Sequence, residues 1–80
     1  MFIIIMQTSV ESRHEQGIIK NDLDRLTGAD RWSIDLGDCQ KVLRVVALHD
    51  ITDQIISVLA SSGFNCSIMD VFHADNPVTS

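Results

Sequence analysis

A chain of 80 residues with 45% hydrophobic side chains can form one domain with a small core, and it is too apolar to be a disordered segment. Its 11 acidic residues against 6 Lys and Arg give a formal net charge of −5, and the basic residues form no run. Because basic residues drive binding to phosphates, this balance argues against a nucleic-acid or anionic-membrane partner.

The apolar stretch 2–6 has five residues, far fewer than the roughly 20 that span a bilayer, and it lacks the flanks of a signal peptide. The two cysteines, Cys39 and Cys66, do not make a disulfide framework. A soluble cytoplasmic protein is therefore expected.

In the first half of the chain, the β-branched and apolar stretch 2–10 predicts a strand. Residues 12–27 predict a helix, since Ile19, Leu23 and Leu26 share one helical face and Gly28 follows as a terminating glycine. The alternation over 31–36 predicts a half-buried strand.

In the second half, a turn at 37–40 precedes a valine-rich strand at 41–48. Asp50 or Thr52 is expected to cap a helix that ends at Gly63, and 64–72 predicts the last strand. The domain is expected to cover residues 1–72, followed by a frayed polar tail at 73–80.

The predicted order is βαββαβ. It indicates an α+β fold, a single ferredoxin-like sandwich in which two helices cover one face of a four-stranded antiparallel sheet. In this topology the first strand lies between the third and the fourth.

Several short patterns, none specific alone, follow one another at matching spacing over residues 4–70. They are Met6, Thr8 and Val10 leading to Ser12 and Glu15, then Ile19 and Leu23, Trp32–Leu36, Lys41–Val45 and Gly63-Phe64. Together they resemble the heavy-metal-associated domains, which include copper chaperones. The resemblance implies a Cys-x-x-Cys metal loop where this chain has Ser12 and Glu15. Since a hydroxyl and a carboxylate cannot replace thiolates for soft ions such as Cu(I), thiolate metal transfer is not carried over.

Ser12 and Glu15 fit a capping box, in which Ser12 accepts from the Glu15 amide and Glu15 accepts from the Ser12 amide. A sharper alternative is a zinc or nickel site of His14 and Glu15, with Glu11 or a partner chain as a third ligand. A nucleophilic Ser12 activated by His14 is the weakest option, because no third group orients the histidine.

The other candidate residues are interpreted as structural. Cys66 is expected to be buried facing the helices, and Cys39 to be exposed in the hairpin. Trp32 is expected in the core, with a partner or an exposed edge for its indole N–H. His49 and His73 fall at element ends, where solvated histidines are common.

The helices leave one sheet face open, and alternation along the strands predicts which residues lie there. Six apolar residues are expected to converge at one end of this face, away from the Ser12 loop: Ile3, Ile5, Val46, Leu48, Met69 and Val71. Such a patch indicates a contact surface, and a face-to-face homodimer would bury it. The alternative is cover from within the chain, by Met1, Phe72 or the tail.

The expected function is therefore that of a non-catalytic, metal-site-deficient relative of the copper-chaperone domains. It would act by protein contact, as a homodimer, without cofactor, bound metal or catalytic residues. Two alternatives stay open. One is metal binding through a non-thiolate or dimer-assembled site, and the other is a small-molecule regulatory domain.

Overall fold

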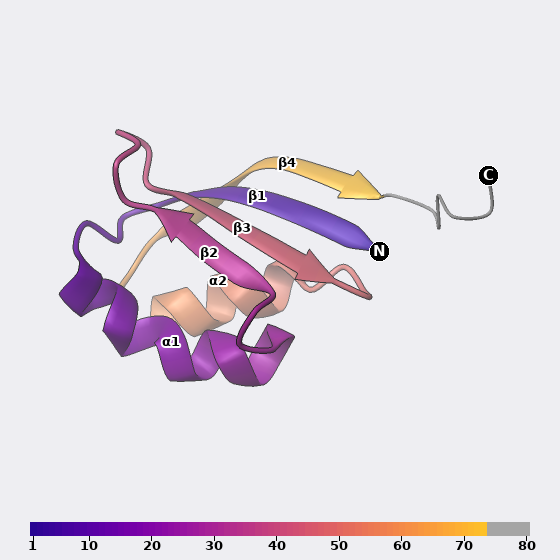
Figure 1. Cartoon of the computed structure of the whole chain (residues 1–80), viewed down its shortest axis with the longest axis horizontal. Helices are drawn as coiled ribbons and strands as arrows, with labels where there is room; N and C mark the ends of the chain where they lie inside the picture. Colours follow the sequence, from indigo (N-terminus) through magenta and orange to yellow (C-terminus); the bar gives the residue numbers. More distant parts are fainter. Residues whose placement is uncertain (74–80) are drawn as a thin grey trace.

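The structure, a computed structural model, describes residues 1–73. Two helices and four strands alternate in the order βαββαβ (Figure 1). Their bounds are β1 Phe2–Thr8, α1 Arg13–Thr27, β2 Trp32–Asp35, β3 Val42–Ala47, α2 Thr52–Ser61 and β4 Cys66–His73. The predicted elements are all present, and their ends differ from the predicted ones by at most two residues.

The strands form one sheet in the order β2-β3-β1-β4, and every neighbouring pair is antiparallel. Figure 1 shows both helices on the same side of this sheet, with β1 between β3 and β4. The chain therefore has the predicted α+β, ferredoxin-like fold.

The core lies between the sheet and the helices, and alternate strand residues point into it. Ile4 and Met6 of β1 are fully buried, as are Leu43 and Val45 of β3, while Ile3 and Ile5 are only partly buried. From the helices and loops the core also takes Val10, Ile19, Leu23, Ile55, Leu59 and Phe64. This pattern confirms the predicted phase of β1 and β3.

The helix ends follow local chemistry. Helix α1 ends before Gly28, whose φ of 105° lies in the region that glycine adopts without strain. Helix α2 begins at Thr52, and Oδ1 of Asp50 accepts from both the amide and the hydroxyl of Thr52, at 3.1 and 2.6 Å. These bonds lower the pKa of the Asp50 carboxyl.

A β-bulge in β4 changes the facing of the residues that follow it. Met6 pairs with Ile68 and Ile5 pairs with Asp70, so Met69 is the extra residue. Beyond the bulge, Val71 lies opposite the buried Ile4 and packs against the core. The prediction that Val71 lies on the open face was therefore wrong, because strict alternation does not survive an inserted residue.

No helix within residues 1–73 is both long enough and apolar enough to cross a membrane. The predicted tail, apart from His73 at the end of β4, lies outside the described residues.

Candidate functional site

The loop before α1, where the family resemblance implies metal ligands, caps the helix in this structure. Ser12 is the N-cap, and its Oγ accepts a hydrogen bond from the Glu15 amide at 3.1 Å, as predicted. The Glu15 carboxylate reaches back to the amide of Glu11 at 2.8 Å, one residue before the predicted partner. Two backbone donors at the helix start are thus satisfied by side chains.

The donors in this loop do not suit a soft metal ion. Ser12 offers a hydroxyl and Glu15 a carboxylate, and both are already engaged in the cap, while His14 is exposed. Soft ions such as Cu(I) prefer thiolates, which neither side chain supplies. Among residues 1–73 there is also no group of three or more His, Cys, Asp or Glu side chains placed to hold a metal ion.

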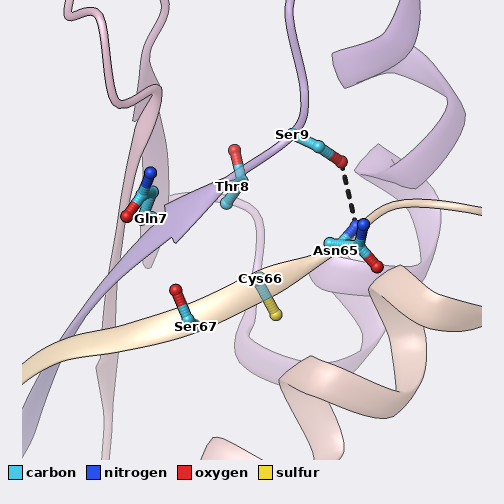
Figure 2. A pocket seen from close by; sticks show the side chains of 6 residues that line it. All are labelled: Gln7, Thr8, Ser9, Asn65, Cys66 and Ser67. Carbon is cyan, nitrogen blue, oxygen red and sulfur yellow. Dashed lines mark hydrogen bonds between the residues drawn. The ribbon is translucent and has the colours of Figure 1, made fainter.

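A shallow hollow of about 230 Å³ lies beside this loop, where β1 ends and β4 begins. It is lined by Gln7, Thr8, Ser9, Asn65, Cys66 and Ser67 (Figure 2). The Ser9 hydroxyl accepts from the Asn65 amide at 2.9 Å, and the Asn65 carbonyl accepts from the Ser9 amide at 3.0 Å. These bonds join the residue that follows β1 to the residue that precedes β4, and the lining of the hollow contains no charged side chain for a ligand.

The two cysteines lie in different surroundings. Cys66 pairs with Thr8 and packs against the core, as its phase predicted, but it is only partly buried. Burial raises the pKa of the Cys66 thiol, which disfavours the reactive thiolate. Cys39 is exposed in the hairpin, in agreement with the prediction.

The open face of the sheet is the other candidate site, and an apolar row crosses it near the start of β1. Ile3 lies opposite Val46 of β3 on one side and Phe72 of β4 on the other. Phe72 is 51% exposed, so the row presents an aromatic ring to its surroundings. Leu48, 72% exposed, follows β3 directly, and Met69 is 45% exposed at the bulge.

The next row of the open face is charged at both ends. Ile5 lies between Arg44 of β3 and Asp70 of β4, and both charged residues are exposed. Within residues 1–73 neither side chain belongs to an ion pair, since the pairs formed there join Lys20 to Asp24 and Arg25 to Asp22. The row thus offers an apolar centre between unpaired opposite charges.

A second hollow, also of about 230 Å³, lies toward the β2 edge of the open face. Arg31, Ser33, Arg44 and Val46 line it, with Asp30 and Trp32 beside them. The carbonyl of Arg31 accepts from the Val46 amide, and Ser33 pairs with Arg44, so these four share the open face. The β2–β3 half of the face is therefore hollowed and carries two arginines.

Sequence reasoning placed Ile3, Ile5 and Val46 on this face, and the register agrees. It missed Phe72, Arg44 and Asp70. Simple alternation along β3 from Val46 would have placed Arg44 there, whereas Asp70 and Phe72 lie on the open face only because of the bulge.

These features define the class of protein as a small ferredoxin-like α+β domain. Its open sheet face carries an apolar row, flanking charges of opposite sign and a hollow. The chain matches no protein-family model, no curated protein and no solved structure.

Proposed function

We propose that this chain is a non-catalytic, metal-site-deficient relative of the copper-chaperone domains that acts by protein contact, as a homodimer formed through the open sheet face. The βαββαβ order supports the relationship. The capped helix start at Ser12 supports the loss of the metal site, because its polar groups stabilise the fold.

One observation carries the contact function: within residues 1–73, the sheet face that neither helix covers places Val46, Ile3 and Phe72 side by side, with Ile5 in the adjacent row. Single apolar residues on a surface need no explanation, whereas contiguous ones are typical of interaction sites. Phe72 is itself part of this face, in register with Ile3, so it extends the apolar surface rather than covering it.

A second copy is a partner that would bury this face. A domain of 80 residues has a small core, so association through apolar surface adds stability that the monomer lacks. The contact function would then be the formation of a homodimer, without metal binding or catalysis at the Ser12 loop.

The test is light scattering on the wild-type protein and on three variants, from micromolar to millimolar concentration. Ile5→Lys or Val46→Glu should convert the dimer to a monomer with an unchanged circular dichroism spectrum. Ile18→Lys is the matched control, since Ile18 is 49% exposed on α1, away from the open face. A wild-type monomer at every concentration, or equal loss of the dimer in Ile18→Lys, would overturn the proposal.

A further inference from the structure

The two halves of the open face differ in charge and in shape. On one side of β1, the β2–β3 half has the hollow whose lining includes Arg31, Arg44 and Val46, and there the two arginines outnumber one acidic residue, Asp30. On the other side, β4 presents the carboxylate of Asp70 and the half-exposed ring of Phe72. If a second copy faces the first with its two halves exchanged, the arginines of one copy lie opposite Asp70 of the other. The hollow of one copy then lies opposite the Phe72 ring of the other.

Register fixes where these groups lie relative to β1. Arg44 and Asp70 both lie opposite Ile5, and Val46 and Phe72 both lie opposite Ile3. Since the backbones of neighbouring strands are about 4.8 Å apart, the Cα atoms of Arg44 and Asp70 lie roughly 10 Å apart, at equal distances from β1. The charges are thus arranged symmetrically about the line of β1, with opposite signs.

Two kinds of two-fold axis can bring open faces together, and the charges distinguish them. An axis running along β1 carries the β3 side of one copy onto the β4 side of the other. It stacks Arg44 on the partner's Asp70 twice, and Val46 on the partner's Phe72 twice. An axis across the strands at Ile5 stacks Arg44 on Arg44 and Asp70 on Asp70, which places like charges together.

We propose that two copies of this chain pack face to face about a two-fold axis close to β1, with Arg44 of each copy paired with the other copy's Asp70. This inference rests on the proposed function, because it specifies the geometry of that homodimer. Ile3 and Ile5 meet their own counterparts on the axis, and each Phe72 enters the hollow beside Arg31 and Arg44 of the other copy. Closed symmetry of this kind is usual for homodimers.

The size of the face sets the strength of association. Four strands about 4.8 Å apart and roughly 3.3 Å of length per residue give a sheet footprint on the order of 450 Å². Typical stable interfaces bury about 800 Å² per partner, so this smaller interface is expected to be weak and the dimer to dissociate on dilution. Its affinity is also expected to fall as salt concentration rises, because the flanking ion pairs are screened.

Charge reversal tests the geometry. Arg44→Asp places an acidic group opposite Asp70 twice, and Asp70→Arg places a basic group opposite Arg44 twice. Each single variant should raise the dimer dissociation constant on the order of a hundredfold or more. The double variant should restore wild-type affinity, and so should a 1:1 mixture of the two single variants. Arg13→Asp, at an exposed position on α1, is the control for the change in net charge.

The possible outcomes separate a failure of this dimer geometry from a failure of the homodimer proposal itself. If Ile5→Lys abolishes the dimer while the reversals at Arg44 and Asp70 change the affinity no more than Arg13→Asp does, the face is the interface but the axis is wrong. If neither the double variant nor the mixture recovers affinity, the pairing is also wrong. A wild-type monomer at all concentrations would overturn both proposals. With the axis across the strands, the single variants would keep the like-charge contacts of the wild type, and their affinity would not fall. Loss of affinity in the single variants followed by recovery in the mixture therefore decides the question even if the double variant does not fold.

Discussion

The indole N–H of Trp32 donates a hydrogen bond of 2.7 Å to Oδ1 of Asp24, and this bond fastens the edge strand β2 to helix α1. The other carboxylate oxygen of Asp24 accepts from Lys20 at 2.6 Å. The bonds from Lys20 and from Trp32 lower the pKa of the Asp24 carboxyl below its ordinary value of 3.8. The ring itself packs against the core, as its strand phase predicted.

Replacing Asp24 with Asn should destabilise the protein at neutral pH and much less in acid. Because the pKa of Asp24 is lower in the folded state, the ionised carboxylate stabilises that state above pH 3.8, and the benefit disappears as pH falls through the folded pKa. Urea unfolding of the wild type and of Asp24→Asn from pH 7 to pH 3 measures this difference.

The amide oxygen of Asn can still accept from Trp32, so this variant isolates the charge. Asp30→Asn is the control, since Asp30 is exposed and makes no side-chain hydrogen bond or ion pair within the described part of the chain. A stability difference between wild type and Asp24→Asn that stays constant over this pH range would contradict the role assigned to the ionised carboxylate.

Removing the helix cap should lower the stability of the whole domain. Ser12→Ala deletes the acceptor for the Glu15 amide, and losses of this kind cost about 0.5–2 kcal/mol of unfolding free energy. Ser57→Ala is the matched control, because Ser57 is exposed within α2 and its hydroxyl makes no hydrogen bond in the described residues. Chemical denaturation that shows equal effects for the two variants would exclude a capping role for Ser12.

Placing two thiolates at the loop should create a metal site. If the scaffold is that of a copper-chaperone relative, Ser12→Cys combined with Glu15→Cys places a Cys-x-x-Cys pair at the start of α1. Thiolates select Cu(I), so calorimetry under reducing conditions should show one strong Cu(I) site per chain that the wild type lacks.

The wild type, which retains Cys39 and Cys66, is the control for binding elsewhere. Strong Cu(I) binding by the wild type that disappears in the triple variant S12A/H14A/E15A would instead favour a native metal site. No gain of binding in the double-cysteine variant would remove the support for the resemblance.

Local pattern was sufficient for the elements and for Ser12 as the N-cap, but it gave Glu15 the wrong backbone partner, Ser12 instead of Glu11. It was insufficient for contacts set by tertiary structure. The spacing of Ile19 and Leu23 predicted a helical face, and both are fully buried. The partner of Trp32 was not predicted, because Asp24 lies on the preceding helix and meets the indole only after folding. The bulge at Met69 also escaped prediction, since an inserted residue in a strand leaves no mark in composition.

The bulge predicts different consequences for two adjacent residues of β4. Val71→Ser should lower the unfolding free energy by roughly 1 kcal/mol, because Val71 packs against the core, and leave association unchanged. Phe72→Ser should weaken association and change monomer stability little, because Phe72 lies on the open face. Thermal unfolding and light scattering on both variants measure the two effects, and the reverse assignment would show that β4 has no bulge.

The most direct test of the homodimer is an isotope-filtered nuclear Overhauser experiment on a mixture of labelled and unlabelled chains at millimolar concentration. We predict contacts between copies from the side chains of Ile3, Ile5, Val46 and Phe72, and none from Ile18 on α1. Absence of any contact between copies, or contacts confined to the helices, would contradict it.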